Sequence, residues 1–231
     1  MAKSRLDNTI KGSKIGLIYQ FVYSFAYFIV RTVFIKTLGN TYLGINGLFS
    51  DILTLLSLAE LGFGTSIMYF MYKPFAENDE KTTTILLHFY GKAYRTIGII
   101  IAIIGVSLTP FLNLIISDMP DIPELKIIYL LYLLNTVLSY FWIYKRSMLI
   151  ADQKIYISYF IQLVAIGLQY VLQIVALIVF RNFLLYLGIQ VFCTFLNNFW
   201  TSKYVDKHYP YTKMYKGEKI PRETLRWAGF W

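Results

Sequence analysis

The feature that most constrains this chain is a series of apolar stretches, each long enough for a helix to cross the hydrocarbon core of a bilayer, which takes about 20 residues. Only 15% of the 231 residues are charged and 57% are hydrophobic, whereas a soluble globular domain carries about a quarter charged residues. The composition therefore predicts an all-α membrane protein with six transmembrane helices. The six stretches are residues 15–36, 42–70, 93–117, 125–144, 155–179 and 183–202.

The second stretch is too long for one straight crossing. As a helix, residues 42–70 would extend over about 43 Å, well beyond a hydrocarbon core of about 30 Å. We expect a bend near Gly62 and Gly64. Glu60 lies beside these glycines, where it caps the bend, binds a coupling cation, or is a structural carboxylate near the interface.

The distribution of basic residues predicts the orientation of the helices. With a cytoplasmic N-terminus, 18 of the 22 Lys and Arg residues fall in cytoplasmic segments, as the positive-inside rule requires. The charges of the loop 118–124, DMPDIPE, are all acidic, which fits an external face. We therefore expect a basic cytoplasmic N-terminus (1–14), a transmembrane lobe (15–202) and a basic cytoplasmic tail (203–231). The net charge of +9 then reflects topology and attraction to anionic membrane lipids, not nucleic-acid binding.

The sequence contains no motif typical of an enzyme, a metal site or a cofactor site. A single cysteine, Cys193, excludes an internal disulfide and a thiolate metal cluster. Gly62-Phe63-Gly64 is not followed by the Lys-Ser or Lys-Thr of a phosphate-binding loop. His88 lies in a charged segment, where we expect it to be solvated. We expect no catalytic residue, no metal ligand and no cofactor.

Polar side chains form a stripe along four of the six stretches. Residues at offsets of 4, 7 and 11 return to one face of a helix. A single stripe is explained by hydrogen bonds between neighbouring helices, which are worth about 0.6 kcal/mol each on average. Four stripes together favour a polar cavity between the helices. The stripes are Gln20, Ser24, Tyr27 and Arg31; Asn135, Ser139, Trp142 and Arg146; Ser158, Gln162, Gln169 and Gln173; and Gln190, Thr194, Asn197 and Thr201.

Arg31 is the arginine that lies within an expected span. It either extends outward to lipid headgroups or faces the cavity, and the second reading is favoured because Gln20 and Tyr27 share its face. Asp51, in the next stretch, lies within reach of an arginine side chain at this depth. Asp51 and Glu60 are nine residues apart and so lie on opposite faces of a straight helix, which prevents both from pairing with Arg31.

Two segments carry a resemblance to a known family. RTVFIKTLGNTYLGINGLF, followed by LSLAELGFGTSIMYFMYKPFAENDEK, resembles the N-terminal region of bacterial polysaccharide repeat-unit flippases of the Wzx type. These belong to the superfamily that includes the MATE drug exporters. The similarity is strongest over residues 28–81 and extends through the spacing of the spans to about residue 202. Two departures are that Glu60 stands where the family more often has Asp, and that this chain has one helical lobe instead of two.

The resemblance implies a multi-pass protein of the bacterial inner membrane. Such a protein moves an undecaprenyl-diphosphate-linked oligosaccharide from the inner to the outer leaflet by alternating access. Arg31 would contact the diphosphate, and Gln20, Tyr27, Asn135 and Trp142 the sugar. Residues 203–231 resemble the linker to a second lobe, so we expect a truncated transporter that works with a second lobe or as a homodimer.

Two other functions remain open on the sequence. Another MATE-like exporter of drugs or lipids would have a cationic or amphipathic substrate and would favour an acidic cavity. A membrane glycosyltransferase or polymerase of the same pathway would need a large loop with catalytic carboxylates, and the loops here are under about 25 residues.

Overall fold

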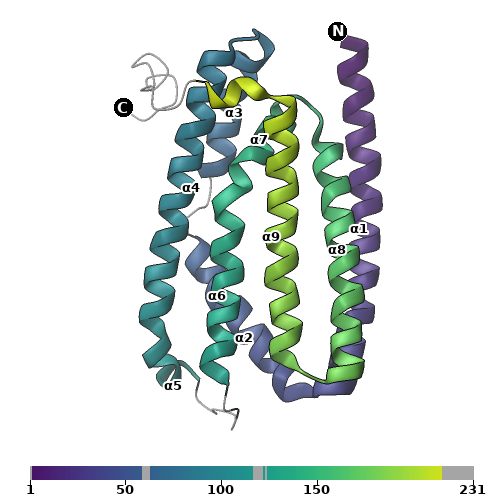
Figure 1. Cartoon of the computed structure of the whole chain (residues 1–231), viewed down its shortest axis with the longest axis vertical. Helices are drawn as coiled ribbons and strands as arrows, with labels where there is room; N and C mark the ends of the chain where they lie inside the picture. Colours follow the sequence, from purple (N-terminus) through teal and green to yellow (C-terminus); the bar gives the residue numbers. More distant parts are fainter. Residues whose placement is uncertain (1, 59–62, 117–121, 123, 215–231) are drawn as a thin grey trace.

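The structure is a computed structural model of the chain and describes residues 2–58, 63–116, 122 and 124–214. Helices account for nearly all of these residues and no strand occurs among them, so the all-α prediction is confirmed. The long helices stand side by side in one elongated bundle (Figure 1). The α-helices are α1 (Ala2–Leu38), α2 (Asn40–Ser57), α3 (Phe63–Ala76), α4 (Glu80–Leu108), α5 (Leu112–Ile115), α6 (Leu125–Trp142), α7 (Arg146–Ala151), α8 (Ile155–Val175) and α9 (Phe183–His208).

Several of these helices are long and apolar enough to span a membrane. Large apolar side chains project from their outer surfaces; Leu17 and Phe21 of α1, for example, are 72% and 75% exposed. A soluble protein rarely exposes so much apolar surface, and the described helices are therefore those of a membrane-spanning protein. The five segments that meet the length and apolarity of a span are Asp7–Leu38, Glu80–Leu114, Leu125–Ala151, Ile155–Phe180 and Phe183–His208.

The second expected span, residues 42–70, is not one helix. It is divided between α2 and α3, of 18 and 14 residues, and neither is among the five segments above. The predicted break near Gly62 and Gly64 agrees with the positions of the two helices: α2 ends at Ser57, and Gly64 lies in the first turn of α3. Glu60 and Gly62 lie outside the described residues.

A glycine turn directs the chain from α1 into α2. Gly39 has a φ of +84°, a left-handed conformation that a residue with a side chain rarely adopts. Its N–H donates to the carbonyl of Ile35 and closes the last turn of α1. α2 starts at the end of the bundle where α1 finishes, and α3 reaches the opposite end (Figure 1).

The connections that carry most of the basic residues lie at one end of the bundle. The N-terminal turns of α1, the α3–α4 connection, the segment around α7 and the end of α9 meet there (Figure 1). The basic connections are therefore concentrated at one end of the bundle axis. Of the expected tail 203–231, residues up to His208 belong to α9 and Pro210–Lys213 form a 3₁₀ turn, while 215–231 lie outside the described residues.

α4 begins at Glu80, 13 residues before the span expected from the sequence. Asp79 caps it by accepting a hydrogen bond from the Thr82 N–H at 2.9 Å, and hydrogen bonds from Thr82 hold the pKa of the Asp79 carboxyl below its usual range. The five residues before His88, Thr83 to Leu87, are buried, and the expectation that His88 is solvated is wrong. His88 is partly buried, and its Nε2 lies 2.8 Å from the Thr212 carbonyl oxygen.

Three glycines at intervals of seven residues let α4 and α6 approach closely. An added Cβ at Gly91, Gly98 or Gly105 would lie 2.4–3.1 Å from side-chain atoms of Tyr144, Tyr140 or Leu133 respectively. Contacts under 3.4 Å are tighter than nearly all real Cβ contacts. The glycine spacing therefore sets the separation of α4 from the α6 segment.

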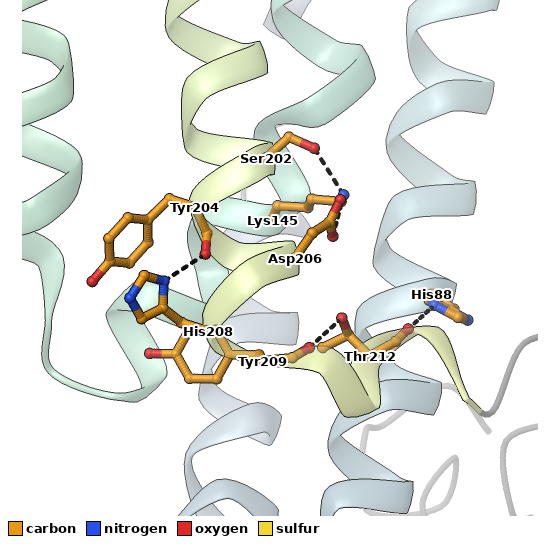
Figure 2. A network of polar contacts seen from close by, with 8 residues as sticks. All are labelled: His88, Lys145, Ser202, Tyr204, Asp206, His208, Tyr209 and Thr212. Carbon is orange, nitrogen blue, oxygen red and sulfur yellow. Dashed lines mark hydrogen bonds and ion pairs between the residues drawn. The ribbon is translucent and has the colours of Figure 1, made fainter.

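A network of polar contacts fastens α9 and the turn after it to the neighbouring helices (Figure 2). Lys145 Nζ lies 2.6 Å from Asp206 Oδ1 and donates to Ser202 Oγ at 2.8 Å. The Tyr209 hydroxyl donates to Asp152 Oδ2 at 2.5 Å. With the contact between His88 and Thr212, these bonds close the end of the bundle where the basic segments meet.

Candidate binding cavity

A polar cavity of about 480 Å³ lies between the helices. It is bordered by α1, α2, α6, α7, α8 and α9, and most of its lining side chains are amides, hydroxyls and aromatic rings. Its lining comprises Tyr23, Tyr27, Asn46, Ser50, Tyr132, Ser139, Trp142, Ile143, Arg146, Ser158, Gln162, Ala165, Ile166, Gln169, Tyr170, Tyr186, Gln190, Cys193, Thr194, Asn197, Asn198 and Thr201.

The polar stripes identified in the sequence meet around this cavity. The stripe on α9 lines it completely, with Gln190, Thr194, Asn197 and Thr201. The stripes on α6–α7 and α8 each contribute three of their four members, and α1 contributes Tyr27 from its stripe. Helical periodicity therefore predicted the cavity-facing sides of α6–α7, α8 and α9, whereas three of the four stripe residues on α1 do not line the cavity.

Part of the polar lining is occupied by hydrogen bonds within the protein. Gln162 Nε2 donates to Ser158 Oγ at 3.0 Å, and Asn198 Nδ2 donates to the Leu138 carbonyl at 3.2 Å. The Tyr132 hydroxyl donates to Asn46 Oδ1 and joins α6 to α2. These bonds orient the lining side chains.

Two buried atoms of the lining have no hydrogen-bond partner among the residues that the structure describes. They are the Nε of Arg146, a donor, and the Oδ1 of Asn197, an acceptor. Buried polar groups are usually hydrogen-bonded, and each exception calls for an explanation. Both atoms are inaccessible to water in this conformation, so the lining side chains must move before a ligand can bond to either atom.

Among the described lining residues, Arg146 is the one with a charged side chain. The 3₁₀ turn Ile143–Lys145 carries the chain from α6 into α7 without a reversal, and this places Arg146 on the cavity side. Its Cζ lies 5.6 Å from the ring centroid of Tyr159, a cation–π contact that supports the guanidinium from one side. No carboxylate of a described residue forms an ion pair with it.

Arg31, the arginine predicted to face the cavity, is not among the lining residues. It is exposed, and its NH1 donates to the Tyr27 hydroxyl at 2.7 Å. Because Tyr27 itself lines the cavity, Arg31 borders the site through that ring. Asp51 is exposed too, and within the described part of the chain it forms no ion pair with Arg31.

The remaining predicted site residues have different positions. Trp142 lines the cavity and packs edge-on against Phe195, with ring centroids 5.8 Å apart. Asn135 does not line the cavity; its Oδ1 is buried and has no hydrogen-bond partner within the described ranges of the chain. Gln20 borders a second groove outside the cavity. Within the described residues, no group of three His, Cys, Asp or Glu side chains is placed to hold a metal ion.

The periodicity of the sequence could have placed Arg146 at the cavity, but the expected end of the fourth span excluded this residue. Arg146 stands at offset 11 of its stripe, as Arg31 does, but it falls two residues past the expected end of the fourth span. The helical path continues through α7, so the periodicity continues too. Tyr132, Tyr170 and Tyr186 were missed because aromatic residues in an apolar run cannot be distinguished from lipid-facing ones.

Comparisons with protein-family models, with curated proteins and with solved structures find no match to this chain. Its fold and its site define a class, that of a multi-helix membrane protein with a polar cavity inside the bundle.

Proposed function

We propose that this chain is one lobe of a transporter that moves an undecaprenyl-diphosphate-linked oligosaccharide from the inner to the outer leaflet of a bacterial membrane. The observation that carries the proposal is the polar cavity inside the bundle with Arg146 on its wall. The name of the substrate comes from the resemblance of residues 28–81 to repeat-unit flippases.

The chemistry of the lining supports a sugar-bearing ligand. Amide and hydroxyl side chains such as Gln190, Thr194 and Asn197 both donate and accept hydrogen bonds, as sugar hydroxyls do. Trp142 and several tyrosines offer apolar ring faces beside these groups. Ligand sites of this kind combine apolar surface with a few polar groups that set orientation.

The charge of the lining supports an anionic headgroup. Arg146 offers a planar fork of donors that matches phosphate oxygens, and no described lining residue is an acid. An exporter of cationic drugs would require the opposite charge in its cavity. The described lining therefore favours the diphosphate lipid over a cationic substrate.

In this proposal α2 and α3 together form one interrupted crossing, the second in chain order, in addition to the five apolar segments. α2 starts at one end of the bundle and α3 reaches the opposite end (Figure 1). The end of the bundle that carries the basic connections would then face the cytoplasm. Alternating access requires a second lobe, supplied by another protein or by a second copy of this chain.

Two arginines that each lie over a tyrosine ring provide the test of this proposal. Arg146 and Arg95 each have their Cζ 5.6 Å from a tyrosine ring centroid, but Arg95 is exposed and does not line the cavity. Binding of an undecaprenyl-diphosphate-linked sugar to the purified chain should weaken at least about tenfold in Arg146→Gln, the loss of one charged hydrogen bond, and stay unchanged in Arg95→Gln. Equal binding by both variants would overturn the role of the cavity.

A further inference from the structure

A groove of about 560 Å³ lies on the outer side of the bundle, between α1 and the junction of α7 with α8. Its α1 side includes Gly12, Gly16 and Leu17, and its other side includes Ile150 and Ile155. The two glycines let α1 approach α8: an added Cβ at Gly16 would lie 3.0 Å from the Tyr159 ring. The N-terminal half of α1, α7 and the start of α8, which line the groove, lie toward the end of the bundle where the basic segments meet (Figure 1).

A stack of tyrosine rings extends from this groove to the cavity. Tyr19 and Tyr159 line the groove, whereas Tyr23 and Tyr27 line the cavity. Successive rings lie 5.6–6.2 Å apart in the order Tyr159, Tyr19, Tyr23, Tyr27 and are stacked at small interplanar angles. The groove and the cavity therefore lie along one continuous stack of rings.

Arg146 and Tyr159 connect the two spaces chemically. The guanidinium lines the cavity and lies over the Tyr159 ring, while the same ring borders the groove. An anionic group held by Arg146 would therefore lie one ring away from a groove with largely apolar walls. Next to the groove, Leu17, Ile18 and Phe21 are more than half exposed on the outer surface of α1, the surface that a spanning helix presents to lipid.

We propose that this groove holds the phosphate-proximal isoprene units of a polyprenyl diphosphate whose diphosphate is bound by Arg146. The proposal rests on the proposed function and extends it to the seat of the hydrocarbon chain. The glycines provide a smooth surface for a methyl-branched chain, and the chain extends from the headgroup along the faces of the stacked tyrosine rings. The groove then retains the chain in the membrane while the sugar occupies the cavity.

The test compares two ligands on four forms of the full chain. The ligands are a sugar diphosphate on an undecaprenyl chain and the same sugar diphosphate on a four-carbon chain. The forms are the wild type, Ser13→Trp, which fills the groove from an exposed position on α1, Arg146→Gln, and a control, Gly167→Trp, which adds the same side chain to α8 where an added Cβ meets nothing within 4 Å. Ser13→Trp should weaken the long-chain ligand at least about tenfold, the effect of losing roughly two buried methylene groups.

The short-chain ligand separates the groove from the cavity. Its affinity should be unchanged in Ser13→Trp and reduced in Arg146→Gln, with Gly167→Trp like the wild type for both ligands. Unchanged long-chain affinity in Ser13→Trp overturns the groove. Affinities insensitive to Arg146→Gln, with a loss in Ser13→Trp, overturn the proposed headgroup site and leave the groove as a chain-binding site.

Labelling of the wild type makes the test independent of the folding of the variants. An undecaprenyl diphosphate with a photoreactive diazirine on its second isoprene should label peptides from residues 9–20 and 150–159. Labels spread evenly over the outer helix surfaces overturn the proposal. Displacement of the label by equimolar phosphatidylglycerol overturns it in favour of general lipid binding.

Discussion

Arg146 lies over the ring of Tyr159 at 5.6 Å, while its sequence neighbour Lys145 forms an ion pair with Asp206 at 2.6 Å. These two adjacent cations thus have different partners. Lys145 is neutralised by a carboxylate and helps close the end of the bundle, whereas Arg146 has an aromatic support, lines the cavity and has no carboxylate partner within the described part of the chain. The first arrangement is structural, and the second leaves the charge available to a ligand.

The positions of the two arginines predict different effects on headgroup binding. Arg31 is exposed and bonded to Tyr27, whereas Arg146 lines the cavity. Arg31→Gln should weaken binding of an undecaprenyl-diphosphate-linked sugar less than Arg146→Gln does, and Arg146→Lys should fall between wild type and Arg146→Gln, because charge is kept but the planar fork is lost. Isothermal titration of all three variants checks this order. A larger loss in Arg31→Gln would return the headgroup site to the first span, as the sequence predicts.

The Lys145–Asp206 pair should stabilise the closed end of the bundle. The side chains are only 15% and 23% exposed, so Asp206→Asn leaves a poorly solvated ammonium with a weaker acceptor. We expect the free energy of unfolding to fall by about 1–3 kcal/mol, measured as a lower Tm in detergent. Lys207→Gln, an exposed change on the same helix, is the control. If the two variants melt alike, the pair contributes nothing to stability.

The sequence was informative wherever a pattern repeats. The apolar stretches located α1, α6, α8 and α9, and the polar stripes located the faces that meet around the cavity. Periodicity works here because a helix returns each side chain to the same face whatever its neighbours are.

Features set by tertiary contacts could not be predicted from the sequence. The end of a span was judged from hydropathy, so Arg146 was placed past the membrane although the helical path continues through α7. His88 was expected in solvent because its segment is charged, yet the turn after α9 covers it. The groove beside Gly12 and Gly16 depends on which helix packs against α1, and the sequence does not show that this helix is α8.

Two tyrosines after α9 should make stability depend on alkaline pH. Burial, and after it the hydrogen bond to Asp152, raises the pKa of Tyr209 above its usual value; burial, and after it the charge of Glu80, raises the pKa of Tyr211 to about 12. Because the folded state holds these protons more tightly than the unfolded chain, whose tyrosine pKa is about 10, their contribution is complete below about pH 10 and is lost above it. For Tyr211 the loss extends from about pH 10 to about pH 12.

The decline of Tm between about pH 9 and about pH 11.5 should therefore be shallower in a variant with Tyr209→Phe and Tyr211→Phe than in the wild type. The variant should also melt lower at about pH 8, since it lacks the Tyr209 hydroxyl that donates to Asp152. An equally steep alkaline decline in both proteins would show that other groups control it.

Close packing of α4 on α6 predicts a large cost for side chains at its glycines. A Cβ at Gly98 would already lie 3.1 Å from the Tyr140 Cβ, so Gly98→Leu must push the helices apart and should cost at least about 1–3 kcal/mol of stability. Gly167→Leu, at a position with nothing within 4 Å, should change little. Chemical denaturation in mixed micelles measures both, and comparable midpoints would contradict the packing.

The single cysteine provides a reporter for the cavity without any engineering. Cys193 lines the cavity but is only 1% exposed, so its reaction with N-ethylmaleimide requires the cavity to open. We expect slow alkylation of the folded chain and rapid alkylation in denaturant. A saturating undecaprenyl-diphosphate-linked sugar should slow the reaction further, because the ligand fills the space beside the thiol. Arg146→Gln should abolish this protection at the same ligand concentration, whereas Arg95→Gln should keep it. Protection that survives Arg146→Gln would mean that the ligand enters the cavity without its guanidinium, and rapid alkylation of the folded wild type would mean that the cavity is open to the reagent from the start.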